Sequence, residues 1–352
     1  MDYDRDLVNC VLSQARDYTA EALRSFFEER RDTGLDTLYE QLADYPFREG
    51  KGLRPGIVYS ACRAMGGTDA QALNTATAVE LFHNGALVHD DIQDVSEFRR
   101  GEATLFKRHG VPIAINAGDA TYVLCLSLLL RNVETLGVRK ALRILQEFER
   151  LSRESVEGQA IELNWIRNST YDLSDDDYVR MAYKKTCWYT IIAPLRLGVI
   201  CGSGPSTAVD LEANLLKLLE LGLLAGIGFQ VQDDLLNLTA DEVIYGKEIS
   251  GDLFEGKRTI MLLHFLRTTD KKSRAEAEAL LKKNRAEKTD EEIRRLHEAM
   301  RVNGSFEYGR EFARSYIERA LAFERNNLAF MPENEHRRFL REMLKFVIFR
   351  LK

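Results

Sequence analysis

The sequence predicts an all-α fold. Its 352 residues include only six prolines, and long stretches lack the alternation of apolar and polar residues that is typical of a half-buried strand. Apolar residues recur instead at spacings of three and four, as in Leu73, Ala76 and Val79 and again from 215 to 224. That spacing is the period of a helix with one buried face. The apolar content of 45% is enough for a substantial core.

Glycine and proline mark the expected loops in order along the chain. These positions are Pro46, the segment 50–55, Gly66-Gly67, the segment 110–112, the segment 202–205 and Gly246. Residues 116–119 are expected to open a helix that runs through Leu130. Ser174 followed by three aspartates predicts a helix N-terminus, where the helix dipole favours acidic side chains. The charge-interleaved segment 269–298 predicts a solvated helical hairpin rather than a functional surface.

No internal repeat or linker of low complexity divides the chain. One domain spanning residues 1–352 is therefore predicted. The net charge of -6 gives no support for a nucleic-acid partner, because such a partner requires a basic face. The five cysteines are odd in number and lack metal-ligand spacing, which indicates buried thiols in a reducing compartment: Cys10, Cys62, Cys125, Cys187 and Cys201.

The first residues are acidic and no apolar signal segment follows them. The longest strongly apolar run, near residues 122–130, is too short to span a membrane. We therefore expect a cytoplasmic protein with no membrane span.

An acidic cluster at residues 90–94 lies in otherwise apolar, helix-patterned sequence. On a helix Asp90 and Asp94 share one face, where their like charges would repel each other unless a cation lay between them. Asp91 points elsewhere and could orient water or a neighbouring ligand. Carboxylate oxygens suit Mg²⁺, and Arg99 and Arg100 close behind them indicate a phosphate-bearing substrate. The alternative is a solvated acidic helix end, which the apolar residues before Asp90 disfavour.

A second acidic cluster, Gln232-Asp233-Asp234, follows about 140 residues later. Asp233 and Asn237 have the same four-residue spacing, although a neutral asparagine is a poorer metal ligand than aspartate. Taken alone this cluster could equally be a helix cap or a surface acid. Facing the first cluster, it indicates a diphosphate bridged by metal.

Cationic side chains lie near several predicted loops and helix ends. Lys51 and Arg54 belong to the glycine-rich segment 50–55, which is either an ordinary turn or a loop that presents cations and N–H groups to an anion. His83 lies two helical turns before Asp90, where a core histidine is the alternative. The remaining cations are Lys185 (followed by Thr186), Lys247, Lys257 and Arg258. Their number predicts two diphosphates, one bound through metal and one bound directly.

At these residues the chain resembles the trans-isoprenyl diphosphate synthases, the family of farnesyl, geranylgeranyl and longer polyprenyl diphosphate synthases. The resemblance covers roughly residues 50–264. It is carried by the segments 50–55, 80–83, 87–94 with 99–101, 185–186, 229–234, 246–247 and 256–257.

The resemblance implies a bundle of long helices around a central cavity, present as a homodimer. It implies that Asp90, Asp94 and Asp233 bind about three Mg²⁺ ions, which hold an allylic diphosphate. The other roles that it implies are assistance at that diphosphate by Arg99, Lys185, Thr186, Lys247 and Lys257; binding of isopentenyl diphosphate by Lys51, Arg54, His83 and Arg100; and a place beside the reacting allyl group for Gln230. The second motif departs from the fullest family pattern at Asn237, which puts that residue's ligand role in doubt.

Three other functions remain possible interpretations of the sequence. A class I terpene cyclase shares the metal chemistry but needs no second diphosphate site. An HD-type phosphohydrolase could use His89 and Asp90, but it leaves Asp233-Asp234 without purpose. A non-catalytic subunit of a heteromeric synthase would be expected to have lost acids that are present here.

Product length is predicted from the helix that carries Asp90. Gly85 and Ala86 lie about one turn from it and are small, whereas farnesyl-forming relatives commonly have aromatic residues there. Phe82, one turn further, and Tyr122 on the next helix are candidates for the floor of the cavity, with ordinary core packing as the alternative. One prenyl unit needs roughly one helical turn of depth. A floor at Phe82 therefore favours geranylgeranyl diphosphate, the C20 product.

Overall fold

The computed structural model describes residues 3–30, 34–48, 50–204, 210–239 and 249–349. Helices make up nearly all of its regular structure, and the one described sheet is a two-stranded hairpin. This confirms the all-α prediction.

The elements, in chain order, are α1 Arg5–Glu28, α2 Asp36–Phe47, α3 Leu53–Ala64, α4 Asp69–Gln93, β1 Phe98–Arg99, β2 Glu102–Ala103, α5 Leu105–His109, α6 Val111–Leu130, α7 Asn132–Leu136, α8 Val138–Arg167, α9 Asp175–Ala182, η2 Tyr183–Ile192, α10 Ala193–Gly202, α11 Leu211–Thr239, α13 Gly251–Glu255, α14 Ile260–Thr268, α15 Lys271–Leu281, η4 Arg285–Glu287, α16 Asp290–Val302, α17 Ser305–Asn327 and α18 Glu335–Phe349.

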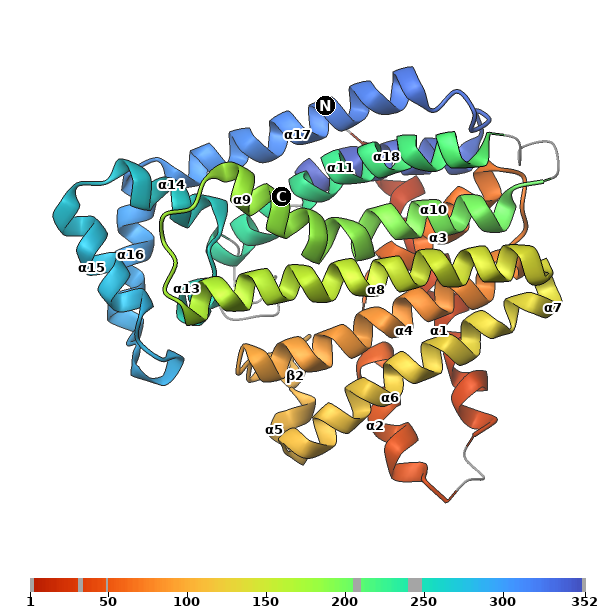
Figure 1. Cartoon of the computed structure of the whole chain (residues 1–352), viewed down its shortest axis with the longest axis horizontal. Coiled ribbons are helices and arrows are strands. Elements are labelled where there is room, and N and C mark those ends of the chain that lie inside the picture. The colour runs from red at the N-terminus through yellow and green to blue at the C-terminus, as the bar shows by residue number, and fades with distance from the viewer. Residues whose placement is uncertain (1–2, 31–33, 49, 205–209, 240–248, 350–352) are drawn as a thin grey trace.

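Helices α8, α11 and α17 run in roughly the same direction along the molecule (Figure 1). Helix α4 packs against α3, α6 and α10, while α11 packs against η2, α17 and α18. Large apolar side chains fill the space between these helices, and Trp188, Ile57, Leu81 and Ile144 are fully buried. The two helices that carry the acidic motifs, α4 and α11, therefore belong to one packed core.

Local sequence accounts for several helix starts. Thr68 opens α4 and Ser174 opens α9, each through a reciprocal capping box, which confirms the prediction at Ser174. The predicted hairpin in 269–298 is also confirmed as α15 and α16, which lie at one end of the molecule in Figure 1.

Three boundary predictions were wrong. The segment 50–55 is a loop only as far as Gly52, because α3 begins at Leu53 and Pro55 lies in its first turn. Helix α6 begins at Val111, not within 116–119, because Pro112 is well suited to the first helical turn and Gly110 supplies the positive φ before it. Pro46 lies inside the last turn of α2 rather than in a loop. A proline is tolerated there because the helix ends one residue later. Gly246 and Pro205 lie outside the described residues.

Two helices, Val111–Leu136 and Leu211–Thr239, are long and apolar enough to cross a membrane by length and composition alone. The second is a core helix of this fold, with 67% of its most apolar window buried. The first is only 39% buried and presents an apolar face on the surface. All five cysteines are free thiols, and all but Cys10 are buried.

Candidate active site

A cavity of about 680 Å³ opens between the helices that carry the two acidic motifs. The predicted site residues that line it are Lys51, Arg54, His83, Asp90, Arg99, Arg100, Lys185, Thr186, Gln230, Asp233 and Lys257. Lys247 lies outside the described residues. Segments far apart in the sequence thus meet at one cavity, as is required if the two acidic clusters form one site.

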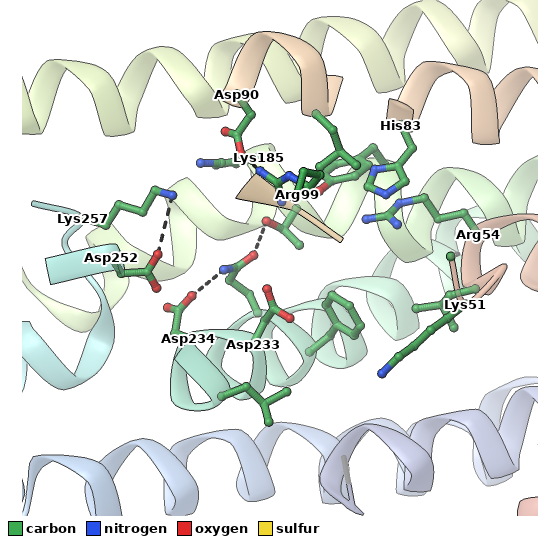
Figure 2. Close-up of a pocket in the computed structure, with 18 of the residues that line it drawn as sticks. Lys51, Arg54, His83, Asp90, Arg99, Lys185, Asp233, Asp234, Asp252 and Lys257 are labelled. Atoms are coloured by element: carbon green, nitrogen blue, oxygen red, sulfur yellow. Dashed lines mark hydrogen bonds and ion pairs between the residues drawn. The ribbon is translucent and has the colours of Figure 1, made fainter. Parts of the chain in front are cut away.

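The charges are distributed unevenly along the cavity. Figure 2 shows Lys51, Arg54 and His83 grouped at one end, and Asp234, Asp252 and Lys257 toward the other. Asp90 and Asp233 lie on opposite sides, on α4 and α11. The cavity therefore has an acidic part and a separate basic part.

Asp90 and Asp91 are neighbours in α4 but face different surroundings. Asp90 faces the cavity, with its Oδ2 3.8 Å from Nη2 of Arg99. Asp91 is completely buried. One of its oxygens accepts from the Arg99 guanidinium, with Nε at 2.9 Å, and the other accepts from the hydroxyl of Tyr45 at 2.6 Å. Asp91 thus holds Arg99 at the cavity wall, a role that the sequence pattern did not reveal.

Asp94 ends α4 and lies beside the cavity rather than in its lining. Its carboxylate accepts from Nζ of Lys257 at 2.7 Å, and the same ammonium contacts Glu255 and Asp252. Burial and the repulsion of Asp90 raise the pKa of Asp94 to about 7, although Lys257 opposes the shift. Because the carboxylates in this part of the site repel one another, the binding of an additional cation is favoured.

The second motif forms a chain of hydrogen bonds across the cavity wall. The hydroxyl of Thr186 donates to Oε1 of Gln230, whose Nε2 donates to Asp234 at 2.6 Å. The other oxygen of Asp234 accepts from the hydroxyl of Tyr178 at 2.8 Å. Burial, followed by the charge of Asp252, raises the pKa of Asp234 well above its ordinary value. Asp233, the next residue toward the N-terminus, lines the cavity itself.

Asn237 is buried and does not line the cavity. Its Oδ1 accepts from the backbone N–H of Asp252 at 3.1 Å, and its carbonyl accepts from the N–H of Ser250 at 2.7 Å. Asn237 therefore caps the start of α13, which places Asp252 at the cavity. This structural role agrees with the expectation that an asparagine here is a poor metal ligand.

Aromatic contacts organise the basic end. The guanidinium of Arg54 lies over the ring of Tyr189 at 4.5 Å, and His83 stacks on the same ring at 5.9 Å between centroids. Arg54 also donates to Thr190 at 3.0 Å. Arg100 has a positive φ of 54° in the hairpin turn and donates to the carbonyl of Tyr45 at 3.0 Å. Burial lowers the pKa of Arg100 below its ordinary value, which an anionic ligand would reverse.

Lys185 and Thr186 lie in η2, a stretch of π-helix that widens the backbone beside the cavity. The ammonium of Lys185 is bound to Glu162 of α8. A side chain in place of Gly158 would collide with the backbone of Lys185 at 2.1 Å, so glycine allows α8 to approach this turn. Burial lowers the pKa of Lys185, but Glu162 outweighs it and keeps the ammonium charged.

The four predicted chain-length residues do not line this cavity. Phe82 is packed against Tyr122 and Phe148, with ring centroids 5.3 and 5.5 Å apart. A Cβ at Gly85 would meet Thr121 of α6 at 2.7 Å, and Ala86 is half-buried. The cavity face of α4 is instead formed by Glu80, His83, Leu87 and Asp90.

Several lining residues were missed from the sequence. They are Arg16, Glu80, Glu162, Tyr178, Tyr189 and Asp252. Asp234, which also lines the cavity, was named in the second acidic cluster but was given no role of its own. Asp252 could have been suspected, because it lies five residues before Lys257 in the short segment from Gly251 to Lys257. The tyrosines carry no comparable local signal.

Within the described ranges, no three acidic, histidine or cysteine side chains are already arranged around a metal position. The donor set nevertheless fits Mg²⁺, which is usually bound by one or two carboxylates together with phosphate oxygens of the substrate. Asp90 and Asp233 face one another across the cavity in this manner (Figure 2). The ligand role of Asp94 stays a prediction, and it requires the contact with Lys257 to loosen.

Comparison with known proteins agrees with this geometry. The family model described as polyprenyl synthetase matches residues 36–300. A geranylgeranyl diphosphate synthase of Methanosarcina mazei is 33% identical over 76% of this chain and 77% of its own. A geranylfarnesyl diphosphate synthase of Aeropyrum pernix is 29% identical over 86% of this chain and 91% of its own.

Among solved structures, the geranylgeranyl pyrophosphate synthase of Corynebacterium glutamicum, complexed with isoprenyl diphosphate and magnesium, is similar with a TM-score of 0.83. It is 25% identical, and the match covers 96% of this chain and 98% of that chain. The chain therefore belongs to the polyprenyl synthetase family and is a trans-prenyltransferase that makes isoprenyl diphosphates.

Proposed function

We propose that the protein condenses isopentenyl diphosphate with an allylic diphosphate in a Mg²⁺-dependent reaction, and that geranylgeranyl diphosphate is its main product. The observation that carries this proposal is the division of one cavity into an acidic part and a basic part. A cyclase has one diphosphate to bind and needs only the acidic part. Two substrates that each carry a diphosphate need both.

The acidic part receives the allylic diphosphate. Asp90, Asp94 and Asp233 would hold the Mg²⁺, about three ions, and the charge of the metal would weaken the bond between the allylic carbon and the diphosphate oxygen. Lys185 and Lys257 add positive charge at the same end. Lys247 belongs to the same proposal by family resemblance.

The basic part receives isopentenyl diphosphate. Lys51, Arg54, His83 and Arg100 line it, and their donors suit a second diphosphate. Binding both substrates in one cavity places the double bond of isopentenyl diphosphate beside the allylic carbon, which raises the effective concentration of the two partners.

The cavity must protect a reactive allylic cation. Leu87, Phe229 and Leu236 line it with apolar surface, which keeps water away from the cation. Gln230 presents an amide at the same place, where its oxygen dipole can stabilise positive charge. The departing diphosphate then takes the proton that the condensation product releases.

Support for a C20 product comes from α4. Gly85 and Ala86 are small, and a turn further from Asp90 the ring of Phe82 contacts those of Tyr122 and Phe148. These aromatic residues do not line the 680 Å³ cavity, so we propose them as the floor of an extension of that cavity, which the growing chain would open along α4. The related enzymes named above are named for products of different chain length, so membership of the family does not predict a C20 product. The proposal of a C20 product rests on this group of residues instead.

We also propose that two copies of the chain form a homodimer through α6. Ile115, Val123, Leu126 and Leu130 form one stripe along this helix, and each is 44–64% exposed. This exposed apolar stripe, which is interrupted only by Asp119 among the described residues of its face, fits a second copy of the same surface. The single domain over residues 1–352 and the cytoplasmic location remain part of the same proposal, the latter supported by five free thiols.

One incubation tests the reaction. The purified chain is mixed with Mg²⁺, isopentenyl diphosphate and, separately, dimethylallyl, geranyl or farnesyl diphosphate, and the products are identified by mass. We expect C20 diphosphate from each starter. A cyclic hydrocarbon from geranylgeranyl diphosphate alone would replace the proposal by a cyclase, and a product only after a second protein is added would indicate a subunit of a heteromeric enzyme.

A further inference from the structure

The second aspartate of each acidic motif is held in the same way. Tyr45 of α2 donates to Oδ2 of Asp91 at 2.6 Å, and Tyr178 of α9 donates to Oδ2 of Asp234 at 2.8 Å. In both pairs the other carboxylate oxygen binds a side chain of the cavity wall. Asp91 binds Arg99, and Asp234 binds Gln230.

Because both carboxylates are buried, their hydrogen bonds restrict the rotation of the side chains. The exposed fraction of Asp91 is 0% and that of Asp234 is 6%, so water does not replace a lost partner easily. Each carboxylate has both oxygens occupied, which fixes its rotation about the bond to Cβ. Removal of the tyrosine hydroxyl would release one oxygen and allow the carboxylate to turn away from its second partner.

The two partners have different tasks. Arg99 lines the cavity beside Asp90, where its charge would face a diphosphate. Gln230 is restrained from both sides, because Oε1 accepts from Thr186 while Nε2 donates to Asp234. Both oxygens of Asp234 accept, one from the Tyr178 hydroxyl and one from Nε2 of Gln230, so the contact with Asp234 turns the Oε1 end of the Gln230 amide toward Thr186.

We propose that Tyr45 and Tyr178 are positioning residues of the prenyl transfer: Tyr45 orients Arg99 for diphosphate binding through Asp91, and Tyr178 orients Gln230 for the chemical step through Asp234. This inference rests on the proposed function of the cavity. It goes beyond that function because it predicts two different kinetic effects for the same Tyr→Phe change at two positions, of which Tyr45 also accepts from the N–H of Leu105 at 3.1 Å.

The chain offers a matched control. Tyr308 and Arg267 both bind Asp175, which repeats the tyrosine–aspartate–arginine arrangement of Tyr45. None of these three residues lines the cavity. Tyr308→Phe therefore removes the same kind of hydrogen bond without reaching the site.

The experiment compares Tyr45→Phe, Tyr178→Phe and Tyr308→Phe by steady-state kinetics with both substrates varied. A hydrogen bond of this kind contributes about 0.5–1.5 kcal/mol, or roughly twofold to tenfold in the affected constant. Tyr45→Phe should raise KM for the allylic substrate by about that factor and change kcat little. Tyr178→Phe should lower kcat by about that factor and leave both KM values near those of the wild type.

Two further measurements separate positioning from general stability. The dissociation constant for inorganic diphosphate, measured by calorimetry at saturating Mg²⁺, should rise for Tyr45→Phe and not for Tyr178→Phe or Tyr308→Phe. In an Arg99→Lys background, Tyr45→Phe should have little further effect on this constant, because the residue through which it acts is already altered.

Equal changes in kcat and KM in all three variants would overturn the inference, as would wild-type values in the two site variants. If Tyr45→Phe does not fold, Asp91→Asn replaces it, and if Tyr178→Phe does not fold, Asp234→Asn replaces it. The same kinetic effect is expected from each replacement. Wild-type kinetic constants in these variants would contradict the inference. A wild-type enzyme that makes no prenyl diphosphate would instead refute the proposed function.

Discussion

The ammonium of Lys257 donates to the carboxylate of Asp94 at 2.7 Å, although 163 residues separate the two in the chain. The contact joins the end of α4 to the segment that follows α13. Lys257 is enclosed by three acidic partners, Asp94, Asp252 and Glu255. Burial lowers its pKa, and these carboxylates more than reverse that effect, so the ammonium stays charged. It occupies a place where a bound cation would compete with it.

The first prediction concerns the metal ligands. Asp90→Ala and Asp233→Ala should each lower kcat by several orders of magnitude at saturating Mg²⁺, because each removes a cavity carboxylate without opening the core. Asp94→Ala should be as damaging if Asp94 leaves Lys257 to bind metal. Near-normal turnover, measured on variants whose circular dichroism matches the wild type, would contradict the ligand assignment.

Asn237→Ala provides the contrasting case. We expect a much smaller loss of turnover, together with a loss of about 1 kcal/mol in the free energy of unfolding, because the amide caps the N–H of Asp252. Denaturant titration and kinetics on the same samples check both parts. Turnover as low as in Asp233→Ala would show that Asn237 binds metal after all.

The two diphosphate sites should be separable by kinetics. Arg100→Ala and His83→Ala should chiefly raise KM for isopentenyl diphosphate, by about tenfold to a hundredfold, since a charge-assisted hydrogen bond contributes roughly 1.5–3 kcal/mol. Part of the Arg100 effect will reflect the carbonyl of Tyr45, which loses its donor. If only the allylic KM rises, the two sites have been assigned the wrong way round.

Product length should respond to the floor residues. Ala86→Phe should shorten the main product to C15, and Phe82→Ala should lengthen it by removing one ring from the contacts with Tyr122 and Phe148. Chromatography of the dephosphorylated products measures the distribution. Val156→Ala, an exposed change on α8, serves as the control. If neither site variant shifts the distribution, the floor lies elsewhere.

Lys288 should give the protein a measurable pH dependence of stability. Its Nζ donates to the carbonyls of Leu253 and Phe254 at the end of α13, and burial lowers its pKa to about 8, with Arg258 and Arg285 adding to the shift and Glu255 opposing it. Between that pH and about 10.5, the ordinary pKa of lysine, the unfolded chain binds a proton that the folded chain does not.

The contribution of Lys288 to the free energy of unfolding therefore increases as pH rises through this window. Urea titrations at three pH values from roughly 7.5 to 9.5 should show a smaller increase for Lys288→Met than for the wild type. Lys272→Met, at a side chain that is 85% exposed, should keep the wild-type slope. Identical slopes in both variants would refute the shifted pKa of Lys288.

The α6 stripe predicts the oligomeric state. Leu126→Glu should convert the dimer to a monomer in size-exclusion chromatography with light scattering, because a charge in a closed apolar interface has no partner. Val302→Glu, at a residue of α16 that is 72% exposed, should leave the assembly unchanged. A wild-type chain that is already monomeric would exclude the dimer directly.

Local sequence was enough for much of the fold. The spacing of apolar residues identified helices, and a capping serine located the start of α9. The prediction of the helix start was wrong at α6. Gly110 and Pro112 set the start of this helix at Val111, whereas the prediction had relied on the polar residues from position 116. Boundaries depend on one or two local residues, whereas the existence of a long helix depends on its whole apolar face.

The sequence by itself was enough to predict that Asp90 and Asp233 line one cavity, as they do, because carboxylates that repel one another in apolar helices favour a compensating cation and recur here in two similar motifs. Only the tertiary structure decided that Asp91 and Asp234 are buried partners of Tyr45 and Tyr178. The physical reason is that the type and spacing of the acidic residues can be recognised within a single helix. A hydrogen bond between side chains 46 or 56 residues apart forms only when separate helices have packed together.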